Sequence, residues 1–556
     1  MSLAFRVLML AAWAPLALCQ TTQPPPVPKG SVVGTVIRAD TREPLKKAWV
    51  SVHKIEGQGK STGVLTDASG RFELTDIEPG RYRLSVQRNG YVSQAYGRRG
   101  SDQPGTILSI SPGQTVRDIQ VAMTTAGVLT GRIYDDDGEP VVNSQVFALS
   151  FTYREGRREP LPRGFGQTND LGEFRIYGLA PGSYYVSATF SGWGRPPLAA
   201  GRGVASRGDS ADEMGYAPTY YPGTNDIGRA IPIELKGGEE MAGLDFSLMA
   251  ARAVRVRGRI LNSATGKGEV QAWVMLMPRE SKVRSFSPSA QTNVNDPEGE
   301  FELRGVVPGS YMLIARSSGG DDAYQARIPI EVGPTDVDGL IVPLGKGAEI
   351  AGRVRWEGMS ASNPDHSIRV GLNPREIGLM MWGSRPEVKP DGSFALKNVM
   401  DGDYRVDVAG APEDCYLQSA RMGGDDVLAS GVSISVGRVP GPLEIVINCA
   451  GAILEGSVAD QNLKPVTGAS VVLVPDTERR AMSHLFKTTT TDQYGAFTIR
   501  GIAPGEYKAF AWEKLEMGAY QDPEFLRRFE GDGKVVTVKE GEKLSVQLSL
   551  IPSEGK

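Results

Sequence analysis

Apolar and polar residues alternate along two short segments that recur five times in the chain. In the first copy Phe72 and Leu74 alternate with charged residues, and the alternation resumes ten positions after Phe72, at Tyr82 and Leu84. A period of two is typical of a strand with one buried face. The repeat therefore predicts a strand–turn–strand unit in which both rings enter one core. The ring pairs are Phe72/Tyr82, Phe174/Tyr184, Phe301/Tyr311, Phe394/Tyr404 and Phe497/Tyr507.

Turn residues precede both rings. Residues 67–70, Asp-Ala-Ser-Gly, come before the first Phe, where Asp and Gly supply side-chain caps and permissive backbone angles. Pro-Gly at 79–80 precedes the first Tyr and fits a type II turn, in which Gly takes a positive φ. The fourth copy keeps Gly402 but lacks the Pro. A Tyr just after such a turn suggests a tyrosine corner, whose hydroxyl bonds to nearby backbone.

The repeats are about 105 residues long, a common size for a β-sandwich. A chain of 556 residues is too long for a single core, and its 68 Gly and 37 Pro suit many short turns. We therefore expect an all-β protein of five tandem antiparallel β-sandwiches with an immunoglobulin-like build. The expected boundaries are 31–124, 125–250, 251–345, 346–449 and 450–556.

Only a few residues, such as 346–349, separate the last strand of one repeat from the first strand of the next. Joints this short cannot act as free swivels. We expect a semi-rigid string of sandwiches, stabilised by contacts between nearest neighbours.

The first nineteen residues form an apolar run after Arg6, which predicts a secretory signal peptide at 1–19. Cleavage after Cys19 is one interpretation, and a lipoprotein signal that acylates Cys19 is the other. A proline-rich, extended tether follows at 20–30. No other run reaches membrane-spanning length. The mature chain should be exported to the periplasm, the cell surface or the medium, with no transmembrane span.

The formal net charge is −4, with mixed signs along the chain. This balance provides no field that would attract nucleic acid or an anionic membrane. We therefore expect no nucleic-acid partner.

The second repeat contains a long stretch at 192–223 that ends in a tyrosine-rich segment with Tyr220 and Tyr221. One interpretation is a tolerated surface insertion. The alternative is a binding loop with these rings as a ligand platform, because long loops on sandwiches often carry function.

The frame of Gly-x-Val, Pro-x-x-x-Ala-x-Val at 44–50, Asp-x-x-Gly-x-Phe and Pro-Gly-x-Tyr resembles the carboxypeptidase regulatory-like domain. The resemblance covers all five repeats. It implies a transthyretin-like sandwich, grouped with carbohydrate-binding-like folds and close to the Cna-B modules of bacterial surface proteins. It also implies an exported accessory or binding module, and it carries no catalytic residues to transfer.

Catalytic motifs are absent from the sequence. His53 and Glu56 have the H-x-x-E spacing of two zinc ligands, but residues three apart on a strand point to opposite faces. The chain has only three His, scattered over three repeats, which argues against a Ser-His-Asp triad. We expect a non-enzyme with no cofactor. Acidic runs at 135–137, 321–322 and 425–426 offer oxygen ligands for Ca²⁺, with solvated turns as the simpler interpretation.

Cys415 and Cys449 are the only thiols left once Cys19 is cleaved or acylated. Two cysteines in one exported repeat suggest a disulfide, which would close a loop of about 34 residues. Two buried free thiols are the alternative.

Trp49 and Trp273 occupy the same Ala-Trp-Val slot in the first and third repeats. If the flanking Ala and Val face the core, alternation turns both indoles outward. Exposed rings stack on sugar faces, and they also cement contacts between domains.

Two classes of function remain open. The first is a non-catalytic binding or scaffold protein at the cell surface, with an extracellular glycan as its partner. The second is an accessory component that acts beside a separate peptidase or envelope transport system, with a cell-envelope protein as its partner. Sandwich folds host many unrelated functions, so the fold does not decide between them.

Overall fold

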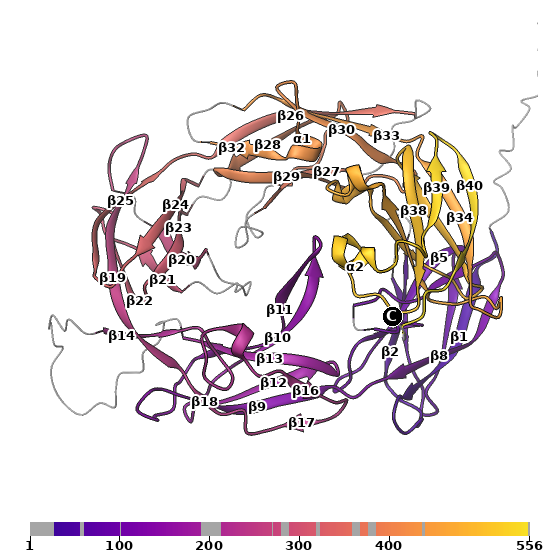
Figure 1. Cartoon of the computed structure of the whole chain (residues 1–556), viewed down its shortest axis with the longest axis horizontal. Coiled ribbons are helices and arrows are strands. Elements are labelled where there is room, and N and C mark those ends of the chain that lie inside the picture. Colours follow the sequence, from indigo (N-terminus) through magenta and orange to yellow (C-terminus); the bar gives the residue numbers. More distant parts are fainter. Residues whose placement is uncertain are drawn as a thin grey trace, which may run out of the picture.

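The computed structural model describes residues 27–55, 61–100, 102–190, 213–268, 271–279, 289–318, 323–358, 367–375, 385–435 and 440–553. The predicted signal peptide at 1–19, including Cys19, and most of the tether lie outside these residues. The described part of the chain is nearly all β, as the alternation predicts (Figure 1).

Each repeat forms two sheets. The strand that carries the Phe of the ring pair lies in one sheet, and the strand that carries the Tyr lies in the other. In the first repeat one sheet has the order β4 (Arg71–Ile77), β1 (Gly30–Arg38) and β8 (Thr115–Met123). The other has the order β3 (Thr62–Leu65), β2 (Trp49–Lys54), β5 (Gly80–Gln87) and β6 (Gln94–Ala95), with β7 (Ile107–Ile110) also on β5.

The second and third repeats keep this plan. In the second, β12 (Glu173–Leu179), β9 (Gly127–Tyr134), β17 (Glu240–Met241) and β18 (Phe246–Ser247) form one sheet, and β11 (Arg157–Gln167), β10 (Gln145–Arg154), β13 (Gly182–Thr189), β15 (Thr219–Tyr220) and β16 (Ile233–Leu235) form the other. In the third, β14 (Glu213–Ala217), β19 (Met249–Asn262), β22 (Glu300–Val306) and β25 (Val337–Leu344) face β21 (Ala290–Val294), β20 (Ala272–Pro278), β23 (Gly309–Ser317) and β24 (Gln325–Val332).

The fourth and fifth repeats add short helices. In the fourth, β28 (Ser393–Val399), β26 (Ala348–Glu357), β33 (Leu443–Asn448), β30 (Tyr416–Met422) and β31 (Asp425–Asp426) face β27 (Arg369–Pro374), β29 (Gly402–Ala409) and β32 (Val432–Ile434), with helix α1 at Val427–Ser430. In the fifth, β37 (Ala496–Ile502), β34 (Ala452–Ala459) and β40 (Lys543–Ser549) face β36 (Lys487–Thr490), β35 (Ser470–Pro475), β38 (Gly505–Trp512) and β39 (Lys534–Val538), with helix α2 at Pro523–Arg527.

One pairing in each repeat differs from the expected antiparallel sandwich. The first strand pairs in parallel with strands at the end of the repeat, as β1 does with β8 and β34 does with β40. Period-two alternation marks which face of a strand is buried but not its direction, so this pairing left no trace in the sequence pattern.

The ring pairs lie in the interior as predicted. Phe72 and Tyr82 are 3% and 5% exposed and belong to a core cluster made only of first-repeat residues. The other four pairs are buried in four separate clusters, each drawn from one repeat. Since Phe and Tyr come from different sheets, the two rings together fill the space between the layers.

The tyrosine corner is present in all five repeats. Tyr82 donates a hydrogen bond from its hydroxyl to the carbonyl oxygen of Glu78, at 2.8 Å. Tyr184, Tyr311, Tyr404 and Tyr507 bond in the same way to the residue four positions earlier, at 2.7 to 2.9 Å. The bond satisfies a polar atom that enters the core with the ring.

In four of the five repeats the Gly before the Tyr does not have the φ of a type II turn. Gly80 has a φ of 153°, and Gly182, Gly402 and Gly505 have φ of 157°, 143° and 143°. A type II turn needs about +80° at this position. The observed region is essentially open only to glycine, which explains why the fourth repeat keeps Gly402 after losing the Pro.

The predicted loop at 192–223 contains two strands. The strand β14 pairs with β19 and so joins a sheet of the third repeat, and β15 pairs with β13 of the second. Residues 191–212 lie outside the described part of the chain. The second and third repeats therefore share a sheet as well as a covalent joint.

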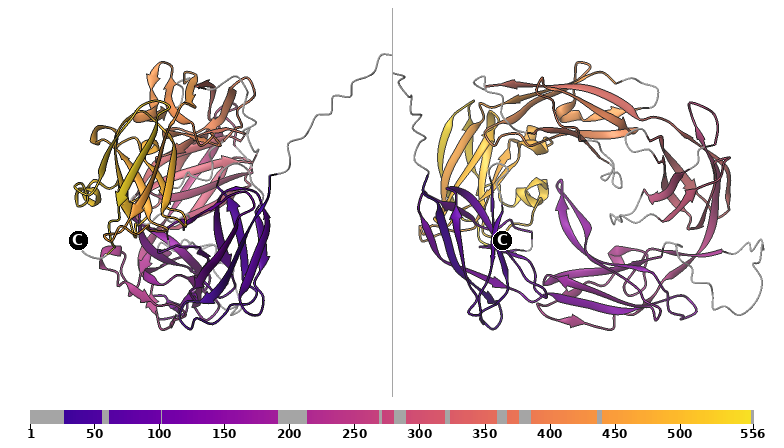
Figure 2. Two further views of the ribbon diagram at one scale, coloured as in Figure 1. Left: turned by 90° about the vertical axis from the view of Figure 1, so that its right-hand side faces the viewer. Right: turned by 180° about the vertical axis from the view of Figure 1, so that it is seen from behind.

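The five sandwiches follow one another around a ring, and the first lies beside the fifth (Figures 1 and 2). Ile107 of β7 forms a parallel bridge with Asp492 of the fifth repeat. The Gln493 side chain donates to the Ser109 carbonyl at 2.7 Å and accepts from the Ser109 amide at 3.0 Å. The expectation of a string with contacts only between nearest neighbours was incomplete, because these contacts join the first and last repeats.

The hairpin of β10 and β11 projects from the second repeat into the ring (Figure 1). Its two-residue turn, Glu155 and Gly156, has positive φ at both positions, as in a type I′ turn. Glu155 forms an ion pair with Arg405 of the fourth repeat at 2.8 Å, and the Tyr153 ring lies 6.3 Å from that of Phe525 in α2. The hairpin thus links the second repeat to the fourth and fifth.

Candidate functional site

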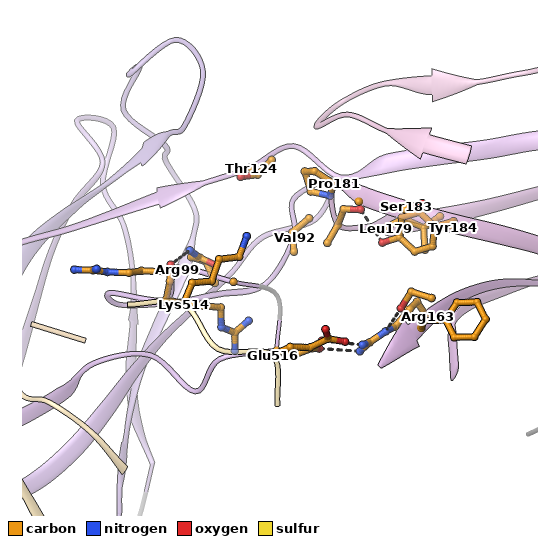
Figure 3. Close-up of a pocket in the computed structure, with 18 of the residues that line it drawn as sticks. Val92, Arg99, Thr124, Arg163, Leu179, Pro181, Ser183, Tyr184, Lys514 and Glu516 are labelled. Carbon is orange, nitrogen blue, oxygen red and sulfur yellow. Dashed lines mark hydrogen bonds and ion pairs between the residues drawn. The ribbon is translucent and has the colours of Figure 1, made fainter. Parts of the chain in front are cut away.

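A cavity of about 1010 Å³ lies where the first, second and fifth repeats meet (Figure 3). The first repeat contributes residues 98–100 and Asp102, which follow β6. The second contributes the β10–β11 hairpin and residues 178–185, from the end of β12 into β13, and the fifth contributes residues 514–516 after β38. The cavity exists only because the ring is closed.

Arg163 joins the first and second repeats at this cavity. Its guanidinium donates to both carboxylate oxygens of Asp102, each at 2.9 Å, and to the Ser150 hydroxyl at 2.7 Å. A two-pronged contact between arginine and carboxylate fixes the geometry as well as the charge. It therefore sets the position of the hairpin against the loop of the first repeat.

Aromatic rings form one wall of the cavity. Phe151 and Tyr185 pack edge to face, with centroids 5.4 Å apart, and the Arg158 guanidinium lies 5.5 Å from the Phe151 centroid. Tyr184 also lines the cavity, and its hydroxyl is used in the tyrosine corner. The wall offers flat apolar surface beside positive charge.

Positive charge predominates in the lining, which has five cationic side chains and two carboxylates. The carboxylates are Asp102 and Glu516. Burial raises the pKa of Glu516, and Arg158 opposes that shift. Burial lowers the pKa of Arg98, whose Nε atom is buried without a hydrogen bond. The cavity thus favours an anionic ligand. The cations are Arg98, Arg99, Arg158, Arg163 and Lys514.

The two Trp candidates lie apart from this cavity and differ from each other. Trp49 is 44% exposed, and its ring packs over Gly63. Trp273 is partly buried against a methionine cluster that includes Met275 and Met400 of the fourth repeat. Trp273 therefore has the environment of a contact between repeats, whereas Trp49 keeps an open face.

Tyr220 and Tyr221 do not form the exposed platform considered for the long loop. Tyr220 is 6% exposed in a cluster with Leu149 and Ile227, and burial raises its pKa to about 12. Tyr221 packs on the core of the second repeat, edge to face with Phe246 at 6.0 Å. The pairing of β15 with β13 therefore buries Tyr220 in a cluster separate from the core, and Tyr221, just after β15, packs against the core itself.

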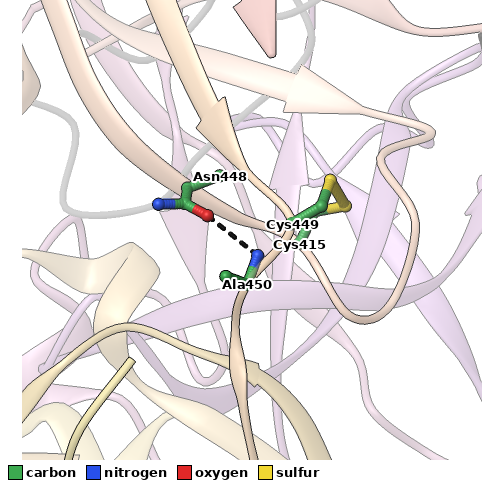
Figure 4. Close-up of a disulfide and its surroundings, with 4 residues drawn as sticks. All are labelled: Cys415, Asn448, Cys449 and Ala450. Atoms are coloured by element: carbon green, nitrogen blue, oxygen red, sulfur yellow. Dashed lines mark hydrogen bonds between the residues drawn. A yellow bond between two sulfur atoms is a disulfide. The ribbon is translucent and has the colours of Figure 1, made fainter. Parts of the chain in front are cut away.

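Cys415 and Cys449 form the predicted disulfide (Figure 4). Cys449 follows the last strand of the fourth repeat, and Cys415 precedes β30. The side chain of Asn448 accepts from the Ala450 amide at 2.8 Å. The disulfide therefore lies where the fourth repeat joins the fifth.

The metal candidates have other roles where they are described. Asp135 accepts from the backbone amides of Asp137 and Glu139, and Asp426 caps α1. The run at 321–322 and Glu56 lie outside the described residues, and His53 contacts the Ser51 hydroxyl at 3.2 Å. Within the described residues no group of three or more His, Cys, Asp or Glu is placed to hold a metal ion.

None of the cavity residues was among the sequence candidates. They come from three repeats, and Asp102 and Glu516 are more than four hundred positions apart. The one available signal was local, since Arg-Arg at 98–99 and Arg-Arg at 157–158 are basic pairs on loops or hairpins. The sequence pattern does not show that these two basic pairs lie together in the fold.

No helix in the described part of the chain is both long and apolar enough to cross a membrane.

The first repeat matches a known family. Residues 31–124 fit the model of the carboxypeptidase regulatory-like domain. A curated protein, serine-aspartate repeat-containing protein D of Staphylococcus aureus, is 26% identical over 133 residues, which cover 22% of this chain and 10% of that protein. The chain thus matches about a tenth of the length of this relative.

Solved structures with similar parts include three bacterial proteins. The Bacillus anthracis TIE protein is 16% identical, covering 57% of this chain and 51% of that one, with a TM-score of 0.16. A streptococcal ancillary pilin is 13% identical, covering 57% and 98%, with a TM-score of 0.18. Two B repeat units of the Staphylococcus aureus collagen binding protein are 11% identical, covering 76% and 99%, with a TM-score of 0.14. Such values carry no argument about function. The family match covers residues 31–124, which are similar to the carboxypeptidase regulatory-like domain.

Proposed function

We propose that this chain is a non-catalytic exported binding protein that holds an acidic glycan in the cavity between its first, second and fifth repeats. The observation that carries the proposal is the combination of an aromatic wall, Phe151 and Tyr185, with an excess of cations around one cavity. Sugar faces stack on aromatic rings, and arginine binds carboxylate with fixed geometry. A volume of about 1010 Å³ is at the upper end for ligand cavities and accommodates several sugar units.

A binding role also fits the rigidity of the site. Arg163 is already committed to Asp102 and Ser150, so it positions the walls. Arg158 and Lys514 are exposed at the cavity and are available to a ligand. Preformed sites lose less conformational freedom when they bind.

The test is a glycan array followed by calorimetry with the full exported chain. We expect binding to uronic-acid oligosaccharides and not to their neutral counterparts. The Arg158→Gln and Lys514→Gln variants should each weaken binding about tenfold, because each removes one charged contact. Lys464→Gln, an exposed lysine outside the cavity, is the matched control.

Two results would contradict the proposal. One is an array with no acidic glycan bound. The other is loss of binding in Trp49→Ala with no effect of Arg158→Gln, which would move the glycan to the exposed face of the first repeat.

A further inference from the structure

A second cavity, of about 470 Å³, lies where the first, fourth and fifth repeats meet. Arg81 and Arg83 of β5 line it from the first repeat, and Asp407 and Glu413 line it from the fourth. His484 and Lys487 line it from the fifth. Like the larger cavity, it is formed by ring closure.

The carboxylates of this cavity are already paired. Glu413 lies 3.8 Å from Arg81, and Asp407 lies 3.3 Å from Arg385. Arg500, which also lines the cavity, is paired with Asp414 at 3.0 Å. No lining carboxylate is therefore left over to neutralise a further cation.

Of the Arg and Lys side chains that line this cavity, Arg83 and Lys487 form no ion pair within the described residues. Both are half-buried, and the Nε atom of Arg83 is buried with no hydrogen bond. Burial lowers the pKa of both side chains, and the charge of Arg81 adds to the effect at Arg83. Cations that are partly removed from water without a partner are costly, and a bound anion would offset that cost.

We propose that this cavity binds a doubly charged tetrahedral oxyanion, a phosphate or sulfate group that Arg83 and Lys487 contact together. Two uncompensated cations match a dianion, whereas a single carboxylate would neutralise only one. The arginine guanidinium can donate two parallel hydrogen bonds to the oxygens of such a group, and the lysine ammonium supplies a compact positive charge. The group is either a free ion or an ester on a larger molecule. The bound anion also stabilises the closed ring, because its two contacts come from the first and fifth repeats.

The experiment measures thermal unfolding of the full chain and calorimetric binding in a buffer free of multivalent anions. Inorganic phosphate, sulfate, glucose 6-phosphate and glucuronate are added at matched ionic strength. We expect phosphate or sulfate to raise Tm in proportion to the logarithm of its concentration. Binding of the sugar phosphate alone would support the same site for an esterified group. Arg83→Gln and Lys487→Gln should each weaken binding at least tenfold, whereas the exposed controls Arg117→Gln and Lys464→Gln should not.

The variants have a second readout. Lys487→Gln should unfold at the same or a higher temperature than the parent in the anion-free buffer, because an uncompensated cation is removed. The proposal is overturned if none of the three oxyanions binds at millimolar concentration, if glucuronate binds more tightly than all of them, or if both variants respond to phosphate as the parent does. Arg158→Gln should leave phosphate binding unchanged, so failure here is distinguishable from failure of the glycan proposal.

Discussion

The fifth repeat has two contact surfaces, one with its chain neighbour and one with the first repeat, and they are built differently. At the contact with the fourth repeat, the chain runs straight through, beside the disulfide of Cys415 and Cys449. The Asn448 side chain donates to Glu540 of the fifth repeat at 2.7 Å, and Arg500 of the fifth repeat pairs with Asp414 at 3.0 Å. The covalent joint at 449–450 already holds the two repeats next to each other, so these contacts close no long loop.

The contact with the first repeat joins residues more than 360 positions apart. Besides the paired bonds of Gln493 and Ser109, Thr490 donates to the Gly105 carbonyl at 2.7 Å, and Arg99 pairs with Glu513 at 3.0 Å. Such a contact must offset the entropy of closing a long loop. The comparison teaches that the neighbour contact is a consequence of the chain, whereas ring closure depends on particular side chains.

The largest expected effect concerns the covalent side of the comparison. Replacing both cysteines, Cys415→Ala with Cys449→Ala, should lower the unfolding free energy of the fourth repeat by about 4 kcal/mol, because a closed loop of about 34 residues is released in the unfolded chain. Hydrogen exchange resolved by segment measures this loss of unfolding free energy in the fourth repeat. Exchange at the contact between the first and fifth repeats should change little. Equal loosening there would show that the two surfaces are one cooperative unit.

The next effect is a loss of stability in acid. Burial and the nearby charge of Lys487 lower the pKa of His484 from 6.5 to about 4. The unfolded chain therefore takes up a proton between these values while the folded chain does not, so this stability is present above pH 6.5 and is lost as the pH falls to about 4. We expect a loss of about 2 kcal/mol, because solvent partly screens the half-buried ring. Chemical denaturation across this range measures it.

The matched variant is His484→Gln, which should remove that part of the pH dependence. Arg81, Arg83 and Arg500 line the same cavity, together with the ion-paired carboxylates of Asp407 and Glu413. An unchanged acid profile in the variant would show that groups other than His484 cause the loss.

A smaller effect should come from the closing contact. Gln493→Ala removes two hydrogen bonds to Ser109 and should cost about 1.5 kcal/mol of closure. Small-angle scattering should then show a larger radius of gyration, and exchange at 105–110 should rise. Gln461→Ala, an exposed glutamine of the same repeat, is the control. No change in either measurement would mean that the remaining contacts suffice.

The smallest effect should be local to one sandwich. Tyr82→Phe removes the hydrogen bond to the Glu78 carbonyl and should destabilise the first repeat by about 1 kcal/mol without affecting ring closure. Thermal unfolding followed in the first repeat measures it. Tyr177→Phe, at a residue 73% exposed, should have no effect. A matching loss in that control would point to a general effect of the hydroxyl.

The local parts of the structure could be predicted from the sequence because their causes are local. The ten-residue spacing of Phe72 and Tyr82 placed both rings in one core, and the position after the turn predicted the tyrosine corner. The conformation of Gly80 could not be read, since Pro-Gly fits more than one turn. The parallel pairing of first and last strands was also hidden, because alternation carries no direction.

The cavities could not be predicted from the sequence for a different reason. Gln493 and Ser109 lie in ordinary turns and strands, and no pattern marks them as partners. The alternation on its strand predicts an outward-facing side chain for Arg83. This side chain is half-buried only because the fourth and fifth repeats lie against it. Trp49 and Trp273 share the Ala-Trp-Val triplet, and their different exposure depends on which repeat lies next to them.

The hairpin that reaches from Tyr153 and Glu155 to the fifth and fourth repeats has a mechanical consequence. In a ring whose repeats contact only their neighbours, the repeats can slide against one another. A contact that crosses the interior of the ring restricts this relative motion. The hairpin thereby limits how far the second, fourth and fifth repeats can shift against one another when a single rim contact breaks.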